Sequence, residues 1–157
     1  MKPGRLPTRV VLDKIGVDVD SLLCPRCGRE LETVDHALVS CVVVKKLWGL
    51  IGRWWKVDVD SANSWEELCE CGKSGDANNI RSRRWLAMVW CSLYIVWSNR
   101  NKVVFEKANR EIADFFFDLQ LKTYEWMSRK DNTFAIDWAT WLMDPGEAGD
   151  ARGRMRS

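Results

Sequence analysis

One short segment constrains this chain more than any other feature, because it gathers four soft metal ligands. The ligands follow the spacing C-x2-C-x8-H-x4-C and are Cys24, Cys27, His36 and Cys41. Two cysteines two residues apart can bind one ion from a tight turn, and Zn²⁺ accepts tetrahedral sets of thiolate and imidazole. Gly28 follows the second cysteine, where such a turn often needs a positive φ. We therefore predict a zinc site here, with ordinary thiols beside a chance histidine as the alternative.

The six cysteines do not indicate a disulfide-stapled secreted protein. The start of the chain shows no apolar signal segment. The chain has 157 residues and 46% hydrophobic content, which suits one compact domain with a hydrophobic core. We expect a reducing, intracellular setting, in the nucleus or the cytoplasm. Cys69, Cys71 and Cys91 lack a further ligand for a second zinc, since His36 is the only histidine, so we interpret them as free or core thiols.

Apolar periodicity predicts an all-α fold, in which a zinc knuckle is followed by a small irregular helical bundle. We divide the chain into a zinc-knuckle region with flanking helices (1–56), an irregular acidic connector (57–79), a Trp-rich helical region that packs on the first (80–145) and a disordered tail (146–157). Helix starts are expected at Thr8, at Ser64 in a capping box and at Asn78 or Asn79. No strand alternation or internal repeat is evident.

The ten tryptophans should build the core, chiefly through a long helix that ends near Glu106. Its stretch from Trp85 to Trp97 is almost wholly apolar, but it is shorter than the ~20 residues that cross a bilayer. We therefore expect a buried helix and no membrane association. Its predicted buried stripe is Leu86, Val89, Trp90, Leu93, Trp97 and Val104, and that of the next helix is Phe116, Leu119, Tyr124 and Met127.

The basic residues allow two interpretations. The net charge of +2 says nothing about nucleic acid, but Arg81, Arg83 and Arg84 form a cluster at the start of the long helix. Together with the zinc segment they could form a basic surface for a phosphate backbone, or they could simply begin a helix on its wet side. The sequence leaves both open.

Several landmarks together resemble the zinc-binding domain at the C-terminal end of plant non-LTR retrotransposon reverse transcriptases. The matching stretches are Leu6-Pro7-Thr8 with Leu12 and Gly16, Cys24-Pro25-Arg26-Cys27-Gly28, Glu32-Thr33, His36-Ala37-Leu38, Cys41, Leu47-Trp48, the Arg-Asn segment from Val96 to Phe105, and Trp126 with Trp138. The chain begins just after a Trp- and Pro-containing pattern that family members usually carry, and Val42-Val43-Val44 stands where they often have Ala or Pro. The missing upstream pattern suggests a truncated fragment of such an element or a mispredicted gene.

The resemblance implies a zinc-stabilised nucleic-acid-binding module and not a polymerase. Two-metal polymerase chemistry needs paired carboxylates, and this chain has no adjacent aspartates. We expect no catalytic residues and no small-molecule substrate; the partners would be RNA or DNA and the rest of a reverse transcriptase. The candidate contacts are Arg5, Arg9, Arg26 and Arg29 for phosphates, with Arg26 and Arg29 facing solvent, and Trp54 or Trp55, if exposed, for stacking on bases. The alternative is a structural or protein-interaction domain that packs on the polymerase or a partner.

Overall fold

The computed structural model describes residues 2–73, 75, 79–107, 111, 112 and 114–146. Within them the chain is helical, and the only β contact is an isolated bridge between Leu23 and Leu31. The predicted all-α class is confirmed. The elements in chain order are η1 (Pro3–Arg5), α1 (Arg9–Lys14), η2 (His36–Ser40), α2 (Val42–Trp55), α3 (Trp65–Cys71), α4 (Ile80–Phe105), α5 (Asp114–Lys130) and α6 (Trp138–Met143).

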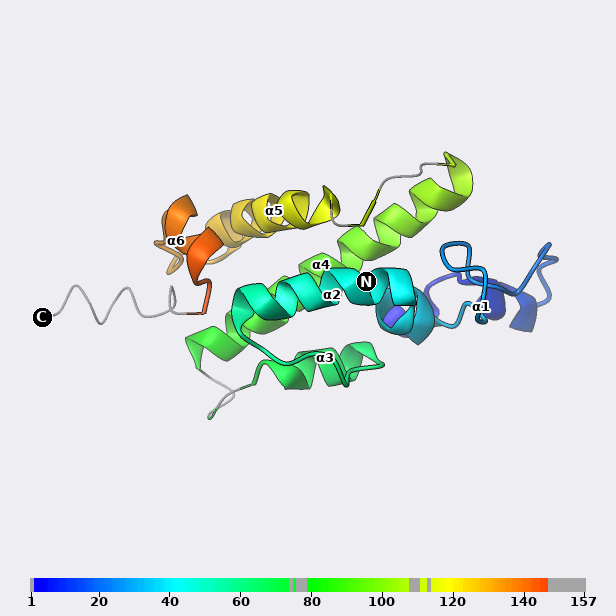
Figure 1. Ribbon diagram of the computed structural model, residues 1–157, viewed down its shortest axis with the longest axis horizontal. Helices are drawn as coiled ribbons and strands as arrows, with labels where there is room; N and C mark the ends of the chain where they lie inside the picture. Colours follow the sequence, from blue (N-terminus) through cyan, green and yellow to red (C-terminus); the bar gives the residue numbers. More distant parts are fainter. Residues whose placement is uncertain (1, 74, 76–78, 108–110, 113, 147–157) are drawn as a thin grey trace, which may run out of the picture.

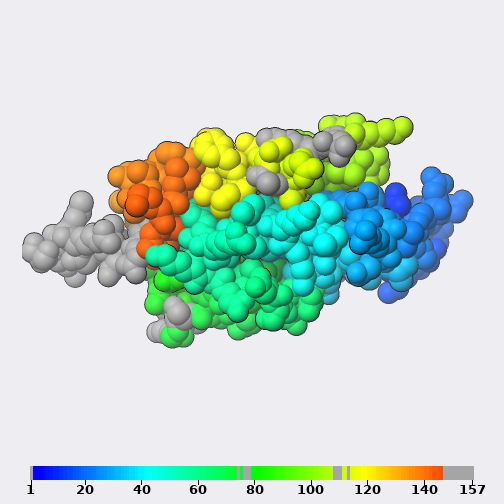
Figure 2. All heavy atoms as spheres, in the orientation of Figure 1, coloured from blue at the N-terminus to red at the C-terminus, as the bar shows by residue number. Residues whose placement is uncertain are grey.

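Helix α4 packs against α3 and α5, and α2 also packs against α5 and meets α4 where Trp55 contacts Trp85; α6 lies beside α5 (Figure 1). The segment before α2 forms one end of the molecule, and α5 and α6 run along one long side (Figure 2). Residues of the N-terminal end and of α4 nevertheless belong to the same hydrophobic cluster, which runs from Leu6 to Trp141. The proposed division at residues 56 and 79 stays an interpretation of the sequence.

Tryptophans fill the centre of the bundle, as expected. Trp54, Trp55, Trp85 and Trp141 are at most 7% exposed and meet edge to face, with ring centroids 5.1–6.0 Å apart. Such aromatic pairs add about 0.5–1.5 kcal/mol each beyond the area they bury. Three of the indole N–H groups donate to backbone carbonyls: Trp54 to Trp141, Trp85 to Leu68 and Trp141 to Gln120. The tryptophans thus fix the mutual positions of α2, α3, α4, α5 and α6.

The buried stripe of α4 differs in part from the predicted one. Val89 and Leu93 are fully buried, but Trp90 is 37% exposed and lies against Trp65 of α3. The buried face also contains Trp85, Met88, Ser92, Ile95, Val96, Asn99 and Arg100. The difference arises because α4 is apolar around most of its circumference, so periodicity alone does not fix which side faces the neighbours. In α5, Leu119 and Met127 are buried as predicted, whereas Phe116 and Tyr124 are half-buried.

The helix starts follow local capping. Thr8, Ser64, Asn79 and Asp137 each accept a hydrogen bond from a backbone N–H in the first turn of the following helix. The predicted capping box forms in part: Ser64 Oγ accepts from the N–H of Glu67, but the Glu67 carboxylate accepts from the N–H of Asn63, one residue before the cap. Among the described helices, none is both long and apolar enough to cross a membrane. Gly146, the first residue of the predicted tail, is buried; residues 147–157 and the alternative cap Asn78 lie outside the described residues.

Candidate metal centre

A tight loop presents the first two cysteines. The N–H of Cys24 donates to Glu30 O at 2.7 Å, and the N–H of Gly28 donates back to Cys24 O at 2.8 Å. Gly28 has φ +64°, a conformation that a side chain disfavours, so the turn needs glycine here. The Leu23–Leu31 bridge closes the base of this loop. Cys24 and Cys27 therefore point to the same side.

A π-helical turn presents the other two ligands. The N–H of Cys41 donates to His36 O at 3.0 Å, which is the i to i+5 pairing of a π-helix. In an α-helix, residues five apart lie well round the helix from each other, but this wider turn brings His36 and Cys41 to one side. Cys41 itself has ψ 133° and separates η2 from α2. The chain therefore forms two helices here, with Cys41 at the break between them.

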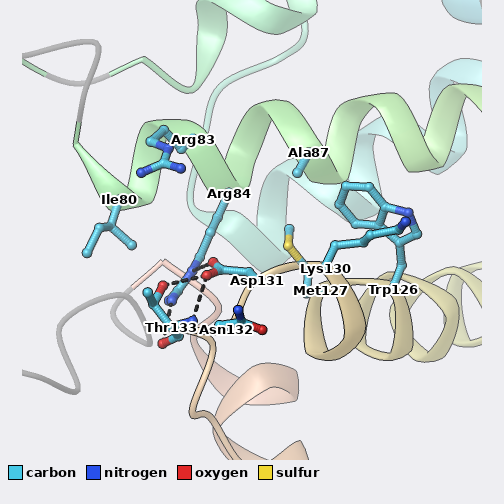
Figure 3. Close-up of a pocket in the computed structure, with 10 residues that line it drawn as sticks. All are labelled: Ile80, Arg83, Arg84, Ala87, Trp126, Met127, Lys130, Asp131, Asn132 and Thr133. Carbon is cyan, nitrogen blue, oxygen red and sulfur yellow. Dashed lines mark hydrogen bonds and ion pairs between the residues drawn. The ribbon is translucent and has the colours of Figure 1, made fainter.

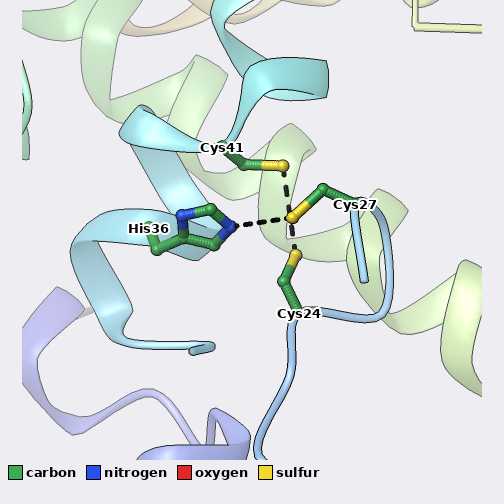
Figure 4. Close-up of side chains that lie close together, drawn as sticks. All are labelled: Cys24, Cys27, His36 and Cys41. Carbon is green, nitrogen blue, oxygen red and sulfur yellow. Dashed lines mark hydrogen bonds between the residues drawn. The ribbon is translucent and has the colours of Figure 1, made fainter. Parts of the chain in front are cut away.

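The four ligand atoms converge on one point (Figure 4). All lie within 4.8 Å of one another; Cys24 Sγ and Cys41 Sγ are 3.9 Å apart, and Cys27 Sγ and His36 Nε2 are 3.3 Å apart. Tetrahedral zinc with bonds of 2.3 Å to sulfur and about 2.0 Å to nitrogen separates two sulfurs by about 3.8 Å and a sulfur and a nitrogen by about 3.5 Å. The residues present fit zinc in both composition and spacing.

The donor set also determines what a metal could do here. Three thiolates and an imidazole complete a tetrahedron, so no position stays open for water or substrate, and such a site is structural. Without metal, Cys24 and Cys41 share a proton: their mutual hydrogen bond, more than burial, raises the pKa of Cys24 to about 12, and the same bond lowers the pKa of Cys41 to about 7. Cys41 is therefore the first of the two to become a thiolate.

A comparison with protein families gives a match that falls on this segment. Residues 1–48 match the family described as zinc-binding in reverse transcriptase. The resemblance drawn from the motifs is confirmed for this zinc-binding region, whereas plant origin, fragment status and the likeness beyond residue 48 stay predictions. The comparison with curated proteins and that with solved structures gave no match.

A carboxylate lies next to the histidine of the zinc-binding region. Glu30 Oε2 is 3.4 Å from His36 Nδ1, the nitrogen that points away from the ligand cluster. Carboxylates commonly orient a metal-bound imidazole through its second nitrogen. The fold of the loop brings this carboxylate to the ring, although the contact does not have the geometry of a hydrogen bond.

Arg26 joins the zinc-binding region to α4. Its guanidinium donates to Ala37 O at 2.8 Å, to Asn99 Oδ1 at 3.0 and 3.2 Å, and to Val96 O. Burial lowers the pKa of this guanidinium, while the nearby Cys41 and Cys24 sulfurs oppose that shift, so the cation also faces the thiolates. The expectation that Arg26 faces solvent is wrong, because all three of its nitrogens are used inside the protein.

A second, fully buried link lies beside it. Glu32 is 0% exposed and receives Arg100 Nε at 2.6 Å, Arg100 Nη2 at 2.7 Å and the backbone N–H of Arg9 at 2.8 Å. The Arg100 guanidinium also lies over the Trp97 ring, 4.9 Å from its centroid. The Arg-Asn segment of α4 thus holds the zinc-binding region in place: Asn99 binds Arg26, and Arg100 binds Glu32.

The other predicted nucleic-acid contacts divide into buried and exposed groups. Trp54 and Trp55 are 7% and 1% exposed, so the condition for stacking on bases is not met and both act in the core. Arg9 is half-buried and donates to Leu23 O at 2.9 Å. Arg5 and Arg29 are exposed. Of the predicted set, these two are the cations best placed to reach a ligand in solvent.

Proposed function

We propose that Cys24, Cys27, His36 and Cys41 hold one structural Zn²⁺. The carrying observation is the convergence of the four ligand atoms in the region that matches the zinc-binding family. The metal would neutralise the thiolates and fix the loop against η2. Two side chains would support it: Glu30 would orient the imidazole, and Arg26 would offset the remaining negative charge.

We further propose that the chain is a nucleic-acid-binding module derived from a retrotransposon reverse transcriptase, without catalytic residues of its own. The exposed Arg5 and Arg29 on the zinc-binding region support contacts to phosphates. The closed donor set and the lack of adjacent aspartates speak against hydrolytic and polymerase chemistry. Its partners would be RNA or DNA and the remainder of the enzyme, in the nucleus or the cytoplasm, with no small-molecule substrate.

Salt dependence tests this function directly. The purified chain, with its zinc content measured, is titrated with fluorescent single-stranded RNA and DNA at increasing salt. A phosphate-binding module loses affinity steeply, with a log–log slope of about −0.7 for each phosphate contact on single strands. The same preparation should extend no primer with Mg²⁺ or Mn²⁺. Absence of binding at low salt would reject the nucleic-acid function, and template-dependent extension would reject the non-catalytic assignment.

A second candidate function is a protein-interaction domain. It is favoured by exposed apolar side chains on α4, α5 and α6: Phe105 is 77% exposed, Tyr94 63%, Phe117 57% and Met143 79%. Such groups can mark a surface that another protein covers. This domain would bind the polymerase part of a reverse transcriptase with little dependence on salt and would not bind oligonucleotides, so the same titration separates the two functions.

A further inference from the structure

The line along which α4 and α5 meet contains two hollows, far along the sequence from the zinc ligands. The larger one has a volume of about 210 Å³ and opens between the start of α4 and the end of α5 (Figure 3). Its walls carry Arg83 and Arg84 from α4, and Trp126 and Lys130 from α5. Trp126 is 41% exposed, so part of its indole face is open to a ligand.

The charge of the larger hollow is positive even after its internal pairing. Arg84 is 3% exposed and is committed to the fold: its Nε lies 3.6 Å from Asp131, its Nη2 donates to Thr133 O, and its guanidinium covers the Phe134 ring. Among the described residues of the lining, the acidic one, Asp131, is therefore already faced by a buried cation. Arg83 and Lys130, which are exposed, supply two further positive charges beside Trp126.

A smaller hollow of about 70 Å³ continues the same seam between α4 and α5. Its described lining combines Tyr94, which is 63% exposed, with Lys102, Lys122 and the acidic Asp118. Arg83 and Tyr94 are eleven positions apart on α4, which corresponds to about 16 Å along the helix axis. At about 3.4 Å for each stacked nucleotide, this length suits roughly five nucleotides.

We propose that the α4–α5 seam binds single-stranded nucleic acid, with a base stacked on Trp126 and phosphates held by Arg83 and Lys130. Exposed aromatics alternating with cations along a groove are the combination that such strands need: the rings stack on any base, and the cations follow the backbone. The exposed cations beside Trp126 favour an anionic strand over an apolar protein surface. The proposal rests on the proposed nucleic-acid function and moves its main contact surface from the zinc-binding region to the helical part of the chain.

The test uses the full zinc-loaded chain and a fluorescein-labelled oligouridylate of about ten nucleotides. Trp126→Ala should weaken binding about tenfold, and Trp126→Phe should restore most of it, because the stacking ring returns. Arg83→Ala with Lys130→Ala should lower the log-affinity against log-salt slope by about 1.4, or 0.7 for each lost contact. The matched control removes two exposed cations of α2, Lys46→Ala with Arg53→Ala, and should leave the slope unchanged.

A crosslinking measurement locates the strand independently of any substitution. Irradiating the complex with an oligonucleotide that carries 5-iodouridine and digesting it with trypsin should place the adduct in the peptide 123–129, which contains Trp126. Adducts confined to residues 1–48, with seam variants that bind like the parent, would overturn the seam while leaving the proposed function intact. No binding by the parent chain would overturn both. Equal weakening by the α2 control, or displacement of the RNA by equimolar polyglutamate, would show a response to charge alone and would also overturn the seam.

Discussion

Arg100 donates two hydrogen bonds to Glu32, at 2.6 and 2.7 Å, across a stretch of sequence that includes His36, Cys41 and the helices η2, α2 and α3. Glu32 is 0% and Arg100 5% exposed, so neither charge can turn to water if the other is removed. A buried pair of this kind adds little net stability compared with apolar residues, but breaking it is costly, since a charge then stays buried alone.

We therefore expect Glu32→Gln to lower the free energy of unfolding by about 3–5 kcal/mol. Adding Arg100→Met should recover part of that loss, because the unpaired cation is removed as well. Urea denaturation followed by circular dichroism measures both. Glu70→Gln is the matched control: it breaks the exposed pair with Lys73 and should cost less than about 1 kcal/mol. Unchanged stability of Glu32→Gln would contradict the buried pairing.

The metal content should follow the four converging side chains. We expect one zinc for each chain, and Cys27→Ser should lose it and unfold the zinc-binding region, because metal binding and folding are coupled in such sites. Elemental analysis gives the content, and chelator titration gives the coupling. Cys91→Ser, which changes a half-buried thiol of α4, should keep its zinc. Equal zinc in both variants would remove the site from these residues.

Removing the side chain of Arg26 should lower the stability of the protein, whereas removing that of Arg29, three residues on, should not. Arg26→Ala leaves acceptors at Ala37, Val96 and Asn99 without their donor, and we expect a loss of about 2–4 kcal/mol in the free energy of unfolding. Arg29→Ala changes an exposed side chain and should leave stability within about 0.5 kcal/mol. If Arg29 contacts a phosphate, the salt dependence of RNA binding should fall by about 0.7 instead. Equal stability of the two variants would contradict the internal role of Arg26.

The end of α3 should tolerate no added methyl group. A Cβ on Gly72 would lie 2.2 Å from the ring of Trp85, which is completely buried, although the φ of −94° suits any residue. Gly72→Ala should therefore destabilise the protein by about 1–3 kcal/mol through overpacking alone. Gly49→Ala, within α2 and with nothing within 4 Å of its Cβ, should be neutral or stabilising. Thermal unfolding of the two variants checks this; a higher midpoint for Gly72→Ala would refute the close packing.

Features that depend on neighbouring residues could be predicted from the sequence, whereas contacts between residues far apart in the chain could not. The caps at Thr8, Ser64 and Asn79 depend on neighbouring residues, and the ligand spacing depends on one loop and one turn. The role of Arg26 depends on residues of α4, more than seventy positions away, so its adjacency to Cys27 suggested a solvent position that the fold does not provide.

The buried pair of Glu32 and Arg100 was missed for the same reason. Both residues lie in stretches that carry the family resemblance, and an acidic residue in one such stretch with a basic residue in the other is the signal that could have suggested a contact. The burial of Trp54 and Trp55 could not be predicted for another reason. Two adjacent tryptophans point to different sides of a helix, and the sequence does not show that α5, α6 and α4 cover both sides.

The segment that matches the zinc-binding family and the part of the chain that folds as one unit have different boundaries. The family match ends at residue 48, yet the carboxylate of Glu32 inside it is neutralised by a guanidinium at position 100. A peptide cut at the edge of the match would keep every ligand for the metal but would leave that anion without its counterion and the apolar side of η2 without its cover. The segment that matches the zinc-binding family is therefore shorter than the part of the chain that has to fold together.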